Sequence, residues 1–290
     1  MKLFDNYFYG RPDRGDYTED DQPKTRVQLF FQVLRVRWGG LIGLNLLYLL
    51  FWLPAVVWTF LCLTYLEQNY YEVDFFNVLF TYFLLLCPLV TITGPANTGV
   101  SYVLRNWARD EHAFAWSDFW LGLRENRKQG LLLGFINGFV PLGVYIWFYI
   151  VWMIAGGEMN FFVAAFIYAL ALVALIAAVI CALAAMLMPM QIVTYRQSFV
   201  AKMKNAVIIT LATVPKALGI KLLTYAVPIA LLIVARLCNS TWPLSLLAGL
   251  YCVILISFNK LIVASYANAM CEKYIKPKID GAGTDIGLHT

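Results

Sequence analysis

Side chains that could perform catalysis are few in this sequence, and they are not grouped as a catalytic site requires. The two histidines are His112, which follows an Asp-Glu pair, and His289 near the last residue. A nucleophile with its base, or a metal with its ligands, needs side chains that the fold brings together, and no such set stands out. The HExxH and GxSxG motifs and the Walker-type glycine loop are absent from the sequence. We therefore expect no catalytic residues, no metal ligands and no cofactor, and we predict that the protein is not an enzyme.

The six cysteines are scattered, mostly within apolar runs, and none forms a CxxC pair. In such surroundings a cysteine usually acts as a small buried hydrophobic residue. We expect neither a disulfide framework nor a thiolate metal site.

Polar residues that interrupt the apolar segments are better candidates for a site. They are Asn45, Asn137, Asn259 and Lys260. Amide and amine groups are costly in lipid, so these side chains should face other helices or a water-filled cavity. Lys260 lies about 25 Å into the last apolar segment, at ~1.5 Å per residue. Its amine is expected either to reach the cytoplasmic interface or to form a polar intramembrane site with Asn259 and, for instance, Asn45.

The segments that must position these residues read as membrane helices. Of the 290 residues 61% are hydrophobic and 13% are charged, whereas soluble domains are about 45–50% apolar and about 25% charged. Stretches long enough to cross a hydrocarbon core of about 30 Å are residues 39–66, 75–93, 131–155, 161–190, 218–237 and 243–264. We predict an all-α fold, a polytopic membrane helical bundle with about six transmembrane helices.

The domain limits follow from the polar ends of the chain. Residues 1–25 form a polar segment without the apolar core of a cleavable signal peptide. The six-span membrane domain is expected over 26–271, followed by a short tail, 272–290. Of the 22 Lys and Arg residues, 20 fall in the segments assigned to one side, Arg236 alone falls in the opposite loops, and Lys260 is left inside the last span. Because Lys and Arg accumulate on the cytoplasmic side, we predict that both termini are cytoplasmic.

Two cytoplasmic segments, about 94–130 and 191–220, are expected to be amphipathic. Gly94-Pro95 is predicted to break the helix after the second span, with Pro95 in the first turn of a new helix. Ser117 is predicted to cap a further helix that runs straight into the third span. The stretch 26–38 is predicted to lengthen the first span or to form an interfacial collar.

The first of these segments contains a predicted cytoplasmic docking surface. Its basic and polar residues are Arg105, Arg109, Asp118, Arg124, Asn126, Arg127, Lys128 and Gln129. Basic side chains here are expected near anionic phospholipid, each worth about 1 kcal/mol, and amphipathic helices also fit grooves on partner proteins. We therefore expect membrane lipids and a membrane-protein partner. The net charge of +5 does not indicate nucleic acid, because basic residues mark the cytoplasmic side of a membrane protein.

Three stretches carry a family pattern. They are LIGLNLLYLLFWLP (41–54), LLLCPLVTITGPANTGVSYVLRNW (84–107), and the segment in which Asp118-Phe119-Trp120 is followed by Asn126, Lys128 and Gln129. Together they resemble the YesL-like family of bacterial integral membrane proteins. The resemblance covers about 38–135 and extends through 190–270, where YRQSFVAKMKNA is similar to the family's second cytoplasmic segment. The acidic N-terminal region and the Gly- and Lys-containing tail depart from the family pattern.

The resemblance indicates the biological process in which the protein takes part, but it does not indicate a reaction or a ligand. Members tend to occur in Gram-positive bacteria beside genes for carbohydrate import and polysaccharide breakdown, and the family supplies no catalytic or ligand residues to carry over. We therefore predict a multi-pass protein of the bacterial plasma (inner) membrane that acts as an accessory or partner component in carbohydrate uptake, with a carbohydrate importer as its partner. The alternative is a small membrane transporter or channel for a neutral solute.

Overall fold

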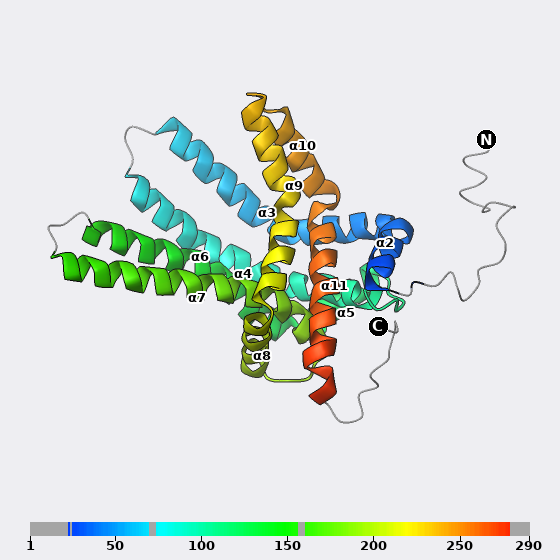
Figure 1. Cartoon of the computed structure of the whole chain (residues 1–290). Coiled ribbons are helices and arrows are strands. Elements are labelled where there is room, and N and C mark those ends of the chain that lie inside the picture. Colours follow the sequence, from blue (N-terminus) through cyan, green and yellow to red (C-terminus); the bar gives the residue numbers. More distant parts are fainter. Residues whose placement is uncertain (1–22, 24, 70–73, 156–159, 279–290) are drawn as a thin grey trace, which may run out of the picture.

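The chain is helical throughout the part that the structure describes. This computed structural model describes residue 23 and residues 25–69, 74–155 and 160–278, and no strand occurs among them. Six helical segments are long and apolar enough to cross a membrane (Figure 1): Trp38–Gln68, Phe75–Trp107, Arg127–Ile154, Phe161–Thr194, Val214–Leu237 and Trp242–Tyr274. The predicted all-α architecture with six spans is confirmed. Most of the predicted polar N-terminal segment and most of the predicted tail lie outside the described residues.

A separate short helix precedes the first span. α2 (Arg26–Val36) begins after Thr25, whose hydroxyl accepts a hydrogen bond from the Gln28 N–H, while the Gln28 side chain accepts one from the Thr25 N–H. This reciprocal pair satisfies N–H groups that the start of a helix leaves free. The helix ends at Arg37, with φ −112° and ψ 21°, and α3 (Trp38–Gln68) follows. The stretch 26–38 therefore does not extend the first span as one continuous helix.

α4 (Phe75–Trp107) is a single helix, so the predicted break at Gly94-Pro95 is wrong. Pro88 and Pro95 both lie inside it. A proline removes one N–H and leaves the carbonyl four residues earlier without its helical donor. Membrane helices tolerate this loss where neighbouring elements cover the freed group. In this protein a later helix, α6, packs along that part of α4.

α5 (Ala115–Glu125) and α6 (Arg127–Ala155) are two helices, rather than the single helix that the sequence predicts. They are separated by Asn126, with φ −107° and ψ 12°. Ser117 does not cap α5, because Phe114 occupies the cap position and its N–H donates to Asp118 Oδ2 at 2.8 Å. The break lets α5 pack on the end of α4 before the chain continues as α6.

The most extensive helix contact lies between α4 and α6, where the two backbones touch. Three glycines on one face of α6 make it: Gly130, Gly134 and Gly138. A Cβ atom at Gly134 would lie 2.4 Å from the Thr91 carbonyl oxygen, and one at Gly138 would lie 2.6 Å from the Cys87 carbonyl oxygen. On the other side, a Cβ at Gly94 would lie 2.1 Å from the Gly130 oxygen. Small residues four apart allow this close approach in membrane helix pairs; we name the three α6 glycines the glycine stripe.

The second half of the chain adds three spans and a short helix between the first two of them. α7 (Phe161–Thr194) begins after Asn160, whose side chain accepts from the Phe162 N–H. α8 (Phe199–Ala212) packs against α7, and α9 (Val214–Leu237) follows after Thr213. The last span consists of α10 (Trp242–Leu250), a π-helical turn η2 (Tyr251–Leu255) and α11 (Ile256–Tyr274), with a 3₁₀ turn η3 (Lys276–Lys278) after it.

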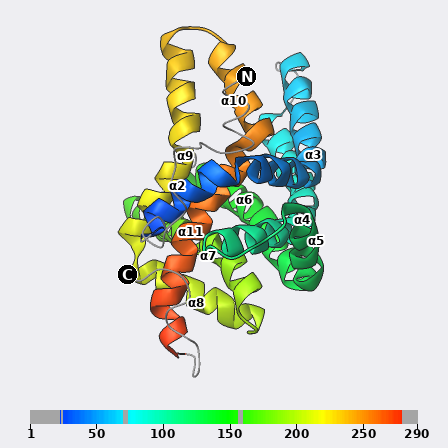
Figure 2. The same ribbon diagram turned by 90° about the vertical axis from the view of Figure 1, so that its right-hand side faces the viewer.

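Three helix pairs extend from a common base (Figure 1): α3 with α4, α6 with α7, and α9 with α10. The base contains α2, α5, α8 and the end of α11 (Figure 2). The buried core is concentrated there and includes Leu104, Phe119, Leu187 and Leu261. In contrast, only 11–22% of the most apolar window of each span is buried. The outward surface is therefore apolar, as contact with hydrocarbon requires.

Candidate functional site

Two cations bind the carboxyl-terminal end of α7. The Arg105 guanidinium donates to the Val193 carbonyl at 2.6 Å, and the Lys202 amine donates to the Ile192 carbonyl at 3.3 Å. The last carbonyls of a helix lack partners within the helix and carry its partial negative charge. α4 and α8 therefore meet at the end of α7, and each brings a charge that this end favours.

Lys202 is a buried lysine, with 2% of the residue exposed. Its amine also donates to Gln129 Oε1, in the first turn of α6, at 2.7 Å. None of the ion pairs found among the described residues includes it. Burial lowers the pKa of Lys202 from its ordinary 10.5 to about 8, because the charged form loses hydration. The amine is therefore mostly protonated at pH 7, and its pKa lies close to that pH.

Gln129 connects this amine to the loop between α7 and α8. Its Nε2 donates to the Gln197 carbonyl at 3.2 Å, and the Asn205 side chain donates to Gln197 Oε1, also at 3.2 Å. We name Gln129, Gln197, Lys202 and Asn205 the Lys202 latch. The latch joins the two segments that the sequence predicts as cytoplasmic and amphipathic.

A second polar cluster joins α2, the turn after α4, and α11. Glu272 of α11 pairs with Arg26 of α2 and, at 4.0 Å, with Arg109 in the turn that follows α4. Arg109 also donates to Asn268 Oδ1 at 2.9 Å. All three charged side chains are largely shielded from solvent, so loss of one partner would leave the others poorly compensated. We name these residues the Glu272 cluster, and it fixes α2 against α11.

Exposed side chains lie along α5 and in the first turn of α6. Three of them are basic: Arg124, Arg127 and Lys128. Trp116 and Leu121 of α5 are also exposed, by 64% and 42%. We name these five residues the α5–α6 corner. It combines an aromatic ring, an aliphatic side chain and three cations.

The eight residues predicted as a docking surface divide into groups with different roles. Arg105, Arg109 and Gln129 point inward and hold the base together. Asp118 accepts from the Phe114 N–H and Asn126 donates to the Gly122 carbonyl, so both stabilise helix ends. Arg124, Arg127 and Lys128 remain available to a partner, and docking at them stays a prediction.

The polar residues predicted inside the spans are not brought together into one site. Asn45 is fully buried. Its Nδ2 donates to the carbonyls of Tyr251 and Cys252 at 2.9 and 2.8 Å. Its Oδ1 accepts from the N–H groups of Ile256 and Ser257 at 3.0 and 3.1 Å. Asn45 thus supplies partners for backbone groups in the first two residues of η2 and in the two residues after it, where the π-turn disrupts the helical pattern.

The other three intramembrane residues have different surroundings. Asn259 donates to the Thr224 carbonyl of α9 at 3.1 Å. The Lys260 amine donates to Asn97 Oδ1 at 2.5 Å and lies 4.5 Å from the Tyr48 ring centroid, a cation–π distance. Lys260 therefore contacts both α4 and α3. Asn137, the fourth residue, is half-buried on α6.

Sequence reasoning missed the glycine stripe, Lys202 and Glu272. The stripe had a signal, since glycines at every fourth position of an apolar segment are typical of close helix contacts. Lys202 and Glu272 had none, because a lone charge in a cytoplasmic segment has the same sequence pattern whether it is solvated or buried.

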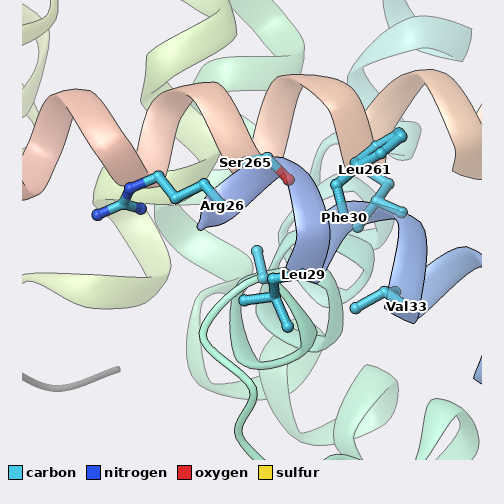
Figure 3. Close-up of a pocket in the computed structure, with 7 residues that line it drawn as sticks. Arg26, Leu29, Phe30, Val33, Leu261 and Ser265 are labelled. Atoms are coloured by element: carbon cyan, nitrogen blue, oxygen red, sulfur yellow. The ribbon is translucent and has the colours of Figure 1, made fainter. Parts of the chain in front are cut away.

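The cavities are small or apolar. One between α2 and α11 is lined by Arg26, Leu29, Phe30, Val33, Leu261 and Ser265, with Ala108 (Figure 3). Its volume of about 10 Å³ is close to what one water molecule needs. A cavity of about 410 Å³ lies between leucines of α3 and Trp116, and one of about 260 Å³ lies between α8 and the end of α11. The last includes Gln197 and Asn205 of the Lys202 latch.

Metal-ligating groups are not assembled in the described part of the chain, where no three His, Cys, Asp or Glu side chains are placed to hold an ion. The cysteines are free thiols. Cys87 and Cys271 are buried as expected, whereas Cys181, Cys238 and Cys252 are exposed on the membrane spans or next to them.

Comparison with known proteins places a family match in the middle of the chain. Residues 75–150 match the family model described as "Protein of unknown function, DUF624". The matched segment contains α4, α5 and most of α6, the unit that the glycine stripe holds together. No curated protein and no solved structure matches the chain.

Proposed function

We propose that the protein is a non-enzymatic integral membrane protein of the YesL-like type, located in the bacterial plasma membrane. In this proposal it acts as an accessory or partner component in carbohydrate uptake. The match at residues 75–150 supports the family assignment. The concentration of basic residues near the base supports a cytoplasmic location for the base and for both termini.

The observation that carries the docking role is the α5–α6 corner. Arginine and aromatic residues are enriched at protein interfaces, and the corner exposes both types. Its supports are rigid. A Cβ at Gly122 of α5 would lie 2.5 Å from the Tyr102 Cβ of α4, so α5 is packed closely, and the Lys202 latch holds the first turn of α6. A preformed surface loses little conformational entropy when a partner binds.

The test is co-purification of the full chain from its native membrane in a mild detergent. The membrane subunits of carbohydrate importers are quantified by mass spectrometry for the native chain and for the triple variant Arg124→Glu, Arg127→Glu, Lys128→Glu. The matched control reverses three exposed charges elsewhere: Arg196→Glu, Lys204→Glu and Lys216→Glu. We expect importer subunits with the native chain and with the control, and their loss in the corner variant.

Uptake of a labelled oligosaccharide by cells that carry each variant gives a second readout. Uptake should fall in the corner variant and persist in the control. Recovery of the native chain without importer subunits, or equal recovery for both variants, would contradict the proposal.

A second candidate function is a transporter or channel for a neutral solute. The observation that favours it is η2, because π-turns in helices are frequent at functional sites. Reconstitution of the purified chain into vesicles, followed by measurement of sugar entry, decides this case. Entry no faster than into protein-free vesicles would remove it.

A further inference from the structure

α9 lacks one backbone hydrogen bond near its middle. Pro228 lies inside the helix and has no N–H, so the Thr224 carbonyl loses its helical donor. The side chain of Asn259, on α11, donates to this carbonyl at 3.1 Å. A residue from a neighbouring helix thus replaces the missing bond.

The last span is interrupted beside this point. η2 ends at Leu255, about one turn before Asn259. The Asn45 side chain of α3 makes four hydrogen bonds here, two to carbonyls in η2 and two to N–H groups in the first residues of α11. α9 and the last span therefore each have a defect at neighbouring positions, and each defect is bridged by an asparagine from another helix.

Residues 229–250, which form the outer part of the α9–α10 hairpin, are poorly covered by the rest of the bundle: of these residues only Pro243 is buried. α9 as a whole also contacts α7, α8 and α11, whereas α10 packs against α9 and η2. Figures 1 and 2 both show the hairpin extending from the bundle as a pair. Its outer side chains are exposed, including Ile229 by 46%, Leu237 by 80% and Leu246 by 45%. The bundle therefore holds the hairpin mainly through its two interrupted ends.

We infer that residues 229–250 move as one rigid hairpin about a double hinge formed by Pro228 and by η2. Prolines and π-turns are the positions at which helices bend, and hinges are a few residues that absorb the change in backbone angles. α11 and the base stay fixed, since the Glu272 cluster and the Lys202 latch hold them. The motion goes beyond the proposed docking function, because no residue of the α5–α6 corner belongs to either hinge.

The test measures distances in the full chain, in lipid nanodiscs, by pulsed electron paramagnetic resonance. Native cysteines are replaced by alanine, and spin labels are placed at Leu237→Cys, near the tip of the hairpin, and Phe60→Cys on α3. The control pair joins Phe60→Cys to Phe148→Cys on α6, which the glycine stripe holds to α4; all three positions are exposed. We expect two populations or one broad distribution for the hairpin pair, and a single narrow distribution for the control pair.

Two hinge variants decide the mechanism. Pro228→Ala restores the N–H of α9, and deletion of Val253 removes the extra residue that the π-turn holds. Each should cause loss of the broad component in the hairpin pair. Pro141→Ala, inside α6, is the matched proline control and should leave the hairpin distribution unchanged.

An unchanged distance in the control pair shows that a variant is folded. If the Val253 deletion variant does not fold, the result for Pro228→Ala decides the mechanism by itself. A native hairpin distribution as narrow as the control, or one that Pro228→Ala leaves broad, would overturn the inference.

Discussion

The Lys202 amine and the Gln129 side-chain oxygen lie 2.7 Å apart, and this contact joins α8 to the first turn of α6. The amine is buried, and its other partner is a carbonyl at the end of α7. A neutral amide and a helix terminus thus take the place of a counter-ion, which leaves the cost of burying the charge only partly compensated.

Replacing Gln129 should weaken the base. Gln129→Leu leaves the buried amine without one acceptor, and a buried group that loses its partner costs about 1–3 kcal/mol. We expect a lower thermal unfolding midpoint in detergent, measured by fluorescence. Lys128→Met, at the exposed neighbouring position, is the control and should leave the midpoint unchanged. Equal midpoints for the native chain and Gln129→Leu would show that the latch does not stabilise the base.

The stability should depend on pH through Lys202. The pKa is about 8 in the folded chain against the ordinary 10.5, so between these values the unfolded chain binds the proton more often than the folded chain. The free energy of unfolding therefore rises with pH across this window. At pH values below the window, the folded chain bears the full cost of burying the charged amine. Thermal midpoints from about pH 7 to about pH 10 should rise more for the native chain than for Lys202→Met. If the thermal midpoints of the native chain and of Lys202→Met change equally with pH, Lys202 is not the source of the pH dependence.

A methyl group in the glycine stripe should destabilise the α4–α6 contact. Gly134→Ala places a Cβ 2.4 Å from the Thr91 carbonyl oxygen, so the backbones must separate. Overpacking of this kind costs about 1–3 kcal/mol, and the unfolding midpoint should fall. Gly143→Ala is the control, because nothing lies within 4 Å of its added Cβ. If Gly134→Ala and the control have equal midpoints, then moving α4 and α6 apart costs no stability.

Asn45 should matter more than any other polar residue predicted inside the spans. Asn45→Leu removes four hydrogen bonds and leaves backbone groups around η2 unpaired in an apolar region. We expect a large drop in thermal midpoint or loss of folded protein on size-exclusion chromatography. Asn137→Leu, at a half-buried position of α6, should have little effect. The reverse ranking of the two variants would contradict the role of Asn45.

Glu272 should control the attachment of α2. Glu272→Gln removes the negative charge that pairs with Arg26 and Arg109. Hydrogen exchange measured by mass spectrometry should then accelerate in residues 26–36 and stay unchanged in α6. Glu125→Gln alters an exposed carboxylate and serves as the control. Unchanged protection of α2 in Glu272→Gln would show that apolar contacts alone hold it.

The spans were predictable because each is set by one local quantity, the length of an apolar run. The helix limits at the base were not. Pro95 reads as a breaker, yet α4 passes through it because α6 covers the same face. Asn126 reads as helical, yet α5 ends there. In both cases the outcome depends on packing between segments, which a local pattern does not contain.

The candidate site divides in the same way. Asn45 stood out as a polar residue in an apolar run, but its partners lie more than 200 positions later in the chain. Arg105 and Arg124 look alike in the sequence, although Arg105 binds a helix end inside the base and Arg124 is exposed. Residue type marked the polar positions, and only the fold separates those that hold the base from those that face outward.

The glycine stripe also bears on how the chain is built. Its contacts join residues 87–95 to residues 130–138 and require nothing synthesised later. Because synthesis proceeds from the N-terminus, α4 and α6 can pair before the ribosome has made α7. The Lys202 latch needs α8 and the Glu272 cluster needs α11, so both close only afterwards. The order of synthesis therefore allows the backbone-to-backbone pair of α4 and α6 to form before the electrostatic contacts at the base.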